Sequence, residues 1–244
     1  MIATDPLDTL MRKLALRDDM SPSERHALAA EAGDVEVRDA GTDLVTEGDR
    51  PSHSTLIVDG FSCRYRMLRD GERQITAIHV PGDFVDLHSF PMKVMDHSVG
   101  VLTTCRIVRF PHEGLDRITR QFPHMTRLLW LMTLLDGAIS REWIVAMGRR
   151  SAQDRMAHLL CELNTRLEVV GLSQNNTFQL PLTQTHFADM LGLSLVHMNR
   201  VVQQLRADDL VSWQNQTLKI LDWQRLTDIA EFDPTYLHLE HLRR

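Results

Sequence analysis

A single glycine between two amphipathic helical patterns is the feature that most constrains the fold of this chain. In the segment 182–206, Thr183 and Ser194 each stand directly before a helical pattern, where a hydroxyl can accept a hydrogen bond from a backbone N–H. Gly192 lies between the two patterns and permits the left-handed backbone conformation that ends a helix sharply. The segment therefore predicts two short helices joined by a tight turn, with inward-facing Phe187, Met190, Leu191, Leu195, Met198, Val201, Val202 and Leu205.

The second predicted helix carries polar side chains near its amino-terminal end, and a short β-hairpin is expected after it. The hairpin pairs strands at 210–213 and 217–221 through a turn at 214–216. A helix-turn-helix with such a wing is typical of domains that place the second helix in the major groove of DNA. Two alternatives remain open, a helical hairpin with an attached β-ribbon and a winged helix that contacts protein. The residues on or near the outer face are Val196, His197, Asn199, Arg200 and Gln203.

Closely spaced turn signals divide residues 35–110 into short, β-branched segments. Each turn contains a glycine, which adopts a positive φ without steric cost. Evenly spaced short strands of this kind predict a β-sandwich or a small barrel. The turns are Ala40-Gly41, Glu47-Gly48-Asp49, Asp59-Gly60, Asp70-Gly71 and Pro81-Gly82-Asp83.

Helical patterns flank this β-rich region on both sides. Before it, Ser21 and Glu24 have the spacing of a capping box, which predicts a short helix. After Pro111 the pattern is again helical, with interruptions at Pro123 and at 148–151. A further helix is expected over 152–169, and the polar stretch 171–178 that follows it is expected to be a loop.

The predicted helix between Pro123 and Gly148 has an unusually wide apolar stripe. A helix that is apolar on more than one face has more than one partner. One face can cover the β domain, and the other can meet a second copy of the chain in a coiled-coil seam. The alternative is burial in a single large core. The apolar residues are Leu128, Leu129, Leu131, Met132, Leu135, Ala138, Ile139, Trp143 and Ile144.

The composition is that of a soluble folded protein, because 43% of the residues are hydrophobic and 25% are charged. The formal net charge of −6 gives no support to a nucleic-acid partner, so such a role needs a local positive patch. Cys63, Cys105 and Cys161 are too widely separated for a disulfide framework, which favours a reducing compartment. With no signal peptide and no apolar run of membrane length, a cytoplasmic location is expected.

Three segments together resemble the Crp/Fnr family of bacterial transcription regulators: the turn at 47–49, the Val-Pro-Gly-Asp-Phe sequence at 80–84, and the helix-turn-helix. The resemblance extends over about residues 20–225. It implies an α+β fold with an N-terminal, jelly-roll-like β-roll similar to cyclic-nucleotide-binding domains at 1–122. A long dimerisation helix at 123–150 and a C-terminal winged helix-turn-helix at 151–244 follow. It further implies a homodimer that binds double-stranded DNA, has RNA polymerase as a further candidate partner, and catalyses no reaction.

On the DNA side, the resemblance places Arg200 at the arginine of the family's Glu-x-x-Ser-Arg or Glu-x-x-Gly-Arg recognition segment. Arg200 is expected to reach a guanine O6/N7 pair or an adjacent phosphate. Val196 stands at the glutamate position and can pack on a thymine methyl, so the family's usual half-site cannot be assumed. For every residue except Arg200, a solvated surface is the alternative. The expected DNA contacts are Thr183, Gln184, Thr185, Ser194, Val196, His197, Asn199, Arg200, Gln203 and Lys219.

The resemblance also locates an effector pocket at Asp86, Leu87, His88, His97 and Ser98. Members that bind cyclic AMP hold its ribose and phosphate with a Gly-Glu-Leu turn and an Arg-Ser pair. These become Asp-Leu-His at 86–88 and His-Ser at 97–98, so the glutamate and the arginine are both missing. Because a phosphodiester loses its bidentate arginine contact, cyclic AMP is not expected to bind, and the effector stays unidentified.

Other cofactors of the family are not expected either. The iron–sulfur members carry an amino-terminal cysteine cluster, whereas the first cysteine here is Cys63. Haem held by His88 or His97 and a thiol sensor remain alternatives. The 12 histidines contain no His-x-His or His-x-x-x-His pair, so no metal site is expected, and a cupin-like metalloenzyme is the least favoured alternative.

Overall fold

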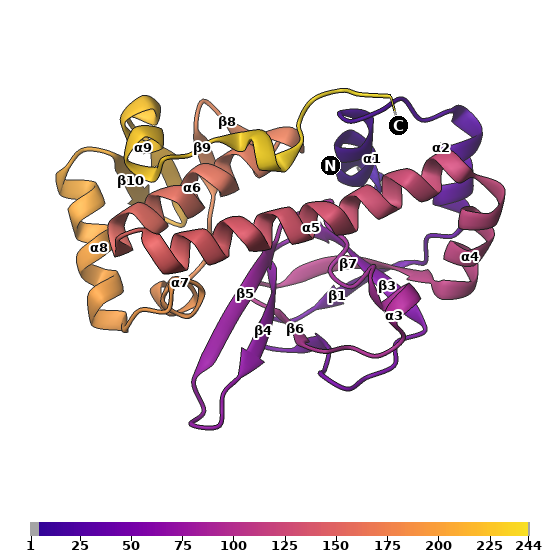
Figure 1. Ribbon diagram of the computed structural model, residues 1–244, viewed down its shortest axis with the longest axis horizontal. Helices are drawn as coiled ribbons and strands as arrows, with labels where there is room; N and C mark the ends of the chain where they lie inside the picture. Colours follow the sequence, from indigo (N-terminus) through magenta and orange to yellow (C-terminus); the bar gives the residue numbers. More distant parts are fainter. Residues whose placement is uncertain (1–4, 244) are drawn as a thin grey trace. The chain divides into compact units, whose positions relative to one another are not determined.

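The computed structural model describes residues 5–243, which fold as two compact units (Figure 1). Unit 1 contains residues 5–66, 78–137 and 238–243, and unit 2 contains residues 67–77 and 138–237. The long helix α5 (Pro123–Arg149) contributes residues to both units. A β-roll precedes this helix and a helix-turn-helix follows it, which confirms the predicted α+β fold class.

The strands β1–β7 form two sheets in the region where the glycine-containing turns predicted a sandwich. One sheet has the order β1-β7-β3, and the other has the order β2-β6-β4-β5. The strands are β1 (Val35–Arg38), β2 (Asp43–Val45), β3 (His53–Asp59), β4 (Ser62–Met67), β5 (Arg73–His79), β6 (Ser98–Val101) and β7 (Cys105–Pro111).

Short helices precede, interrupt and follow these strands. The Ser21 hydroxyl accepts from the Glu24 N–H at 3.3 Å, and the Glu24 carboxylate accepts from the Ser21 N–H at 2.8 Å. This confirms the predicted capping box, in which each side chain satisfies a backbone donor at the helix start. The helices are α1 (Asp8–Ala15), α2 (Pro22–Ala30), α3 (Ser89–Met92) and α4 (His112–Gln121), of which α3 is too short to give a periodic sequence signal.

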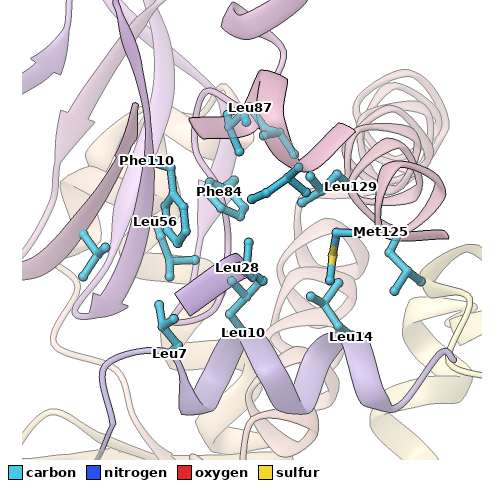
Figure 2. Close-up of a cluster of buried hydrophobic side chains, with 14 of the residues drawn as sticks. Leu7, Leu10, Leu14, Leu28, Leu56, Phe84, Leu87, Phe110, Met125 and Leu129 are labelled. Atoms are coloured by element: carbon cyan, nitrogen blue, oxygen red, sulfur yellow. The ribbon is translucent and has the colours of Figure 1, made fainter. Parts of the chain in front are cut away.

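The core of unit 1 forms between α1, the β-roll and the first turns of α5 (Figure 2). Leu10 and Leu14 are fully buried on the inner face of α1. Phe84 and Phe110 pack edge to face with their ring centroids 5.1 Å apart. Met125, the third residue of α5, belongs to the same cluster. The start of α5 is therefore held by core packing.

The surface of α5 changes along its length. Leu128 and Leu129 are buried in the core of unit 1, and Ala138 and Ala146 are buried farther along. The helix is apolar on more than one face, as its wide stripe predicted. No helix in the described part of the chain, α5 included, is long and apolar enough to cross a membrane. The large apolar side chains that stay exposed on it are Trp130 (63%), Leu134 (53%), Ile144 (70%), Val145 (47%) and Met147 (38%).

Helix α6 (Ala152–Val169) lies at the centre of unit 2, and its bounds are those predicted from the sequence. Helices α8 and α9 pack against it. Ser151 begins it with a capping box shared with Asp154. The remaining elements are α7 (Gln184–Leu191), α8 (Leu195–Ala207), α9 (Trp223–Ala230), the 3-10 turn η1 (Pro234–Leu237), and strands β8 (Ser173–Gln174), β9 (Thr177–Gln179), β10 (Val211–Gln214) and β11 (Thr217–Ile220).

The expectation of a loop over 171–178 is wrong, because β8 and β9 form a hairpin there. Asn175 and Asn176 have φ values of 50° and 56°, and asparagine tolerates the left-handed region that a two-residue hairpin turn requires. The predicted wing is present as β10 and β11, which pair antiparallel. The two hairpins join into one sheet with the order β10-β11-β9-β8, so the wing has twice the expected number of strands.

A buried carboxylate ties three segments of unit 2 together. The Glu162 side chain on α6 is fully buried. It accepts hydrogen bonds from Trp143 Nε1 at 3.2 Å, from the Tyr236 hydroxyl at 3.0 Å and from the Arg166 guanidinium at 2.8 Å. Since each of these donors satisfies a lone pair of the buried charge, the second half of α5, α6 and η1 are held in one arrangement.

We expect the stability of unit 2 to fall in mild acid because of His158. This side chain is 2% exposed and packs against Phe232 and Tyr236, and the Glu142 carboxylate lies 3.8 Å from its Nε2. Burial, with a smaller contribution from Arg150, lowers the pKa of His158 from 6.5 to about 4. The unfolded chain therefore binds a proton below about pH 6.5 while the folded chain does not, which favours unfolding as the pH falls.

The measurement is urea unfolding followed by tryptophan fluorescence, since Trp143, Trp213 and Trp223 report on unit 2. Between pH 7 and pH 5 the wild type should lose about 2 kcal/mol more unfolding free energy than His158→Phe, which keeps an aromatic ring without the titration. Equal losses in both proteins would show that His158 does not cause the acid sensitivity.

Candidate nucleic-acid interface

The helix-turn-helix begins and turns through the residues that the sequence singled out. The Thr183 hydroxyl accepts from the His186 N–H at 3.2 Å, and the Ser194 hydroxyl accepts from the His197 N–H at 3.3 Å. Gly192 follows α7 with φ +60°, a conformation that costs glycine little because it has no Cβ. Thr183 sets where α7 begins, Gly192 sets where it ends, and Ser194 sets where α8 begins.

Other parts of unit 2 support this turn. Arg155 on α6 donates to the Leu191 carbonyl at 2.9 Å, which satisfies an acceptor at the end of α7. Phe187 packs edge to face against Trp213 of β10, with ring centroids 5.2 Å apart. The wing and α7 therefore form one packed body, and α8 starts from a fixed point on it.

The inner face of α8 agrees with the sequence analysis except at its first residue. Met198, Val201, Val202 and Leu205 are buried, whereas Leu195 is 48% exposed. The prediction of an inward-facing Leu195 is wrong: this residue is the first of α8, directly after the Ser194 cap, and its side chain stays in solvent.

The outer face of α8 is open to solvent at its amino-terminal half. Val196 is 64% exposed, and His197, Asn199, Arg200 and Gln203 are also exposed. The Asn199 amide donates to the Leu195 carbonyl at 3.1 Å. Arg200 makes no hydrogen bond or ion pair within residues 5–243, so its guanidinium is available to a partner.

The remaining predicted contact residues flank this face. Thr183, Gln184 and Thr185 lie at the amino-terminal end of α7, where backbone N–H groups and the helix dipole favour an anion. Lys219 is exposed on β11 of the wing, opposite Ser212 of β10. Unit 2 thus presents hydroxyl, amide and cationic groups at α7, α8 and the wing.

One acidic residue of the helix-turn-helix, Asp189, is paired with a cation. The Asp189 carboxylate of α7 forms an ion pair with Arg73 at 2.8 Å. Gln74 donates to the backbone carbonyl of Asp189 at 2.9 Å. Arg73 and Gln74 belong to the β4–β5 hairpin and lie more than a hundred residues from α7 in the chain. No local sequence pattern could therefore predict their contacts with Asp189. The ion pair removes one negative charge from the vicinity of α8.

The predicted effector-pocket residues divide into two groups. The Asp86 carboxylate is fully buried and accepts from the Thr55 N–H at 2.5 Å, and burial raises the pKa of Asp86 to about 7. Leu87 belongs to the core of unit 1. The Ser98 hydroxyl accepts from the Glu47 N–H at 3.0 Å. These three side chains are engaged in holding the β-roll together.

His88 and His97, the other two, face one another with their ring centroids 5.0 Å apart. Burial lowers the pKa of His88 to about 4, and burial followed by the Arg64 charge lowers the pKa of His97. Both rings are therefore neutral at pH 7. Asp96, which the sequence analysis did not single out, accepts a hydrogen bond from His97 Nδ1 at 2.7 Å.

Comparison with known proteins defines the class to which this arrangement belongs. Residues 36–122 match the family model of the cyclic nucleotide-binding domain, and residues 154–229 match that of the Crp-like helix-turn-helix domain. A β-roll of the first kind joined by a long helix to a helix-turn-helix of the second kind is the architecture of Crp/Fnr structures.

Individual relatives agree with this class. The transcriptional activator protein FnrL of Cereibacter sphaeroides is 29% identical over 80% of this chain and 79% of its own length. The nitrogen fixation regulation protein FixK of Bradyrhizobium diazoefficiens is 25% identical over 78% of this chain and 79% of its own. The solved structure of FixK2 from Bradyrhizobium japonicum superposes with a TM-score of 0.73 and 23% identity, covering 80% of this chain and 96% of that one. The chain belongs to the Crp/Fnr family of transcription regulators.

We expect Gly192→Ala to destabilise the helix-turn-helix. A methyl group at φ +60° costs about 1–2 kcal/mol in backbone strain, and the new Cβ would lie 2.8 Å from Met147 Cε. Gly148→Ala is the matched control, since its Cβ would meet nothing within 4 Å and its φ is not positive. Urea unfolding should show a loss for the first variant and none for the second. Equal stabilities would mean that the turn does not need a left-handed residue.

Proposed function

We propose that this protein is a homodimeric, sequence-specific DNA-binding regulator of transcription that inserts α8 into the major groove. The exposed and unpartnered Arg200, held at a fixed place on α8 by the Gly192 turn, is the observation that carries the proposal. An arginine in that position can make two parallel hydrogen bonds to guanine O6 and N7. The proposed DNA-binding domain is 151–244, after a β-roll at 1–122 and a dimerisation helix at 123–150.

The other predicted contacts receive distinct roles in this proposal. Val196, His197, Asn199 and Gln203 read bases beside Arg200, with the Val196 side chain packing on a thymine methyl. The residues that contact phosphates, and so set the register on the duplex, are Thr183, Gln184, Thr185, Ser194 and Lys219.

Charge around α8 supports a DNA partner although the chain as a whole is acidic. The formal net charge is −6, so the favourable field must come from a local arrangement. Arg200 and Lys219 are exposed, whereas Asp189 is neutralised by Arg73. Binding that depends on a few cations within an acidic chain is expected to weaken steeply as salt is added.

Selection of duplexes from a random pool by the ligand-free protein tests the proposal, followed by affinity measurements across a salt series. The enriched site should be two-fold symmetric, with half-sites about 34 Å apart. Arg200→Ala should weaken binding to that site by about 1–3 kcal/mol and relax the preference at one base pair. Arg120→Ala, which removes an exposed arginine of α4 that pairs with Asp116, is the control and should leave affinity unchanged.

If no sequence is enriched with or without cell extract, the partner of the winged helix is not DNA. If the Arg200→Ala variant enriches the same sequence with unchanged affinity, Arg200 does not contact the DNA. Enrichment that requires extract would indicate an effector that aligns the two winged helices.

The dimer is proposed to form through the exposed apolar side chains of α5. Trp130 and Leu134 are one helical turn apart and are 63% and 53% exposed. A second copy of the same helix would cover them in a two-fold seam, in which identical residues meet their counterparts. Leaving such a surface in water is unfavourable by about 25 cal/mol for each Å² of apolar area.

Leu134→Glu should convert the dimer to a monomer, because it places like charges across the two-fold seam. Val37→Glu, at a side chain that is 63% exposed on β1, is the matched control and should remain dimeric. Sedimentation equilibrium measures both masses, and circular dichroism checks that both variants fold. A folded Leu134→Glu protein with a dimer mass would place the interface elsewhere.

We further propose that the protein does not respond to cyclic AMP and does not hold an iron–sulfur cluster. Leu87 stands at the position of the ligand-binding glutamate, the Asp86 carboxylate before it turns inward to the Thr55 N–H, and no arginine stands at residue 97. All three cysteines are buried, at Cys63, Cys105 and Cys161, and none lies before residue 63. A regulator of this kind works in the cytoplasm, contacts RNA polymerase if it is a transcriptional activator as FnrL is, and catalyses no reaction.

A further inference from the structure

The β-roll brings two histidines and an aspartate together at a place that DNA binding does not use. His88 immediately precedes α3, and Asp96 and His97 immediately precede β6. One ligand atom from each of the three side chains lies within 4.8 Å of the other two. The histidines are nine positions apart in the sequence, so no short-range motif revealed the cluster.

Both histidines leave a ring nitrogen without a partner in the protein interior. His88 Nε2 and His97 Nε2 are buried, and neither has a hydrogen-bond partner within residues 5–243. Buried polar atoms are normally satisfied, so a pair of unsatisfied nitrogens in adjacent rings requires an explanation. A shared ligand that accepts electron pairs would satisfy both.

The hydrogen bond to Asp96 sets the chemical state of one of these nitrogens. Asp96 Oδ1 accepts from His97 Nδ1 at 2.7 Å, so the ring proton lies on Nδ1 and the lone pair lies on Nε2. A carboxylate that holds a histidine by its other nitrogen is the usual support of a metal-binding imidazole, since it orients the ring and raises its basicity.

We propose that His88, His97 and Asp96 form a binding site for a divalent transition-metal ion of the zinc, nickel or copper class. Neutral imidazole nitrogens suit these metals, whereas magnesium and calcium require mainly oxygen ligands. Nitrogens bound tetrahedrally at 2.0–2.1 Å lie about 3.4 Å apart, and one ligand atom from each of the three side chains already lies within 4.8 Å of the others. Asp96 can supply an oxygen or can act by holding His97, and water completes the coordination.

Charges around the cluster are compatible with a cation. Two arginines lie near it, and both are engaged. The Arg64 guanidinium donates to Asp136 Oδ2 at 2.6 Å and to the Val85 carbonyl at 2.9 Å, and the Arg66 guanidinium pairs with Glu47 at 3.0 Å and donates to the Asp96 backbone carbonyl at 3.3 Å. Asp96 contributes negative charge on the solvent side, where its side chain is 68% exposed. The Asp86 carboxyl group is buried and also interacts with the Arg64 charge.

Arg64 connects the proposed site to the helix that carries the dimer surface. Asp136 belongs to α5, and Arg64 bridges it to the segment that precedes His88. A divalent ion at the cluster repels the Arg64 guanidinium and so acts on its contact with α5. Metal binding itself does not rest on the proposed DNA-binding function and is tested without DNA.

The test uses the full-length chain without a polyhistidine tag, stripped of metal with a chelator and titrated with zinc ion alone against a chromophoric competitor. We expect one zinc ion per chain at this site. His88→Gln and His97→Gln should each weaken binding at least tenfold, and Asp96→Asn should weaken it by about tenfold as a supporting residue. His26→Gln, on the exposed surface of α2, is the matched control and should bind as the wild type does.

Cobalt substitution of the wild type provides a second readout that needs no variant to fold. X-ray absorption of the cobalt protein should show two imidazole ligands. The proposal is overturned if the wild type binds no zinc below 100-fold molar excess, if the site survives His88→Gln and His97→Gln unchanged, or if the cobalt spectrum shows water and carboxylate ligands only. Loss of DNA binding in Arg200→Ala with zinc binding intact would separate this proposal from the previous one.

Discussion

The apolar surface of α5 is the constraint on which much of this structure depends. Its first turns complete the core of unit 1 through Met125 and Leu129, and Trp143 on its second half donates to the buried Glu162 of unit 2. A single helix therefore contributes side chains to the packing of both units. Its remaining apolar face is exposed at Trp130 and Leu134. A helix with this composition is poorly suited to a monomer in water, which is why we assign the exposed face to a second copy.

The interface on α8 shows how local geometry can oppose bulk composition. The chain carries a formal net charge of −6, yet Arg200 stands exposed and unpaired within the described residues, and the nearby Asp189 is neutralised by Arg73. That ion pair joins residues that are far apart in the sequence. The electrostatic character of the recognition surface is therefore a property of the folded unit and not of the sequence around α8.

The β-roll has kept its fold while changing the groups at its ligand-binding positions. Asp86 is turned into the interior, where it accepts from the Thr55 N–H, so its role is to hold the roll together. His88 and His97 instead approach one another and leave two buried nitrogens unsatisfied. The resemblance to the family placed both histidines in the effector pocket. No metal site was expected, because the two residues form neither a His-x-His nor a His-x-x-x-His pair. The supporting Asp96 carried no sequence signal beyond its proximity to His97.

The sequence by itself determined the elements whose signals are local: the Ser21–Glu24 capping box, the α6 helix over 152–169, and the caps and Gly192 turn that define α7 and α8. These depend on hydrogen bonds and backbone preferences within a few residues. Only the tertiary structure decided that 171–178 adds a hairpin to the wing, that Leu195 is exposed, and that Arg73 pairs with Asp189. Strand pairing, burial and long-range ion pairs depend on which surfaces meet, and periodicity along the chain does not contain that information.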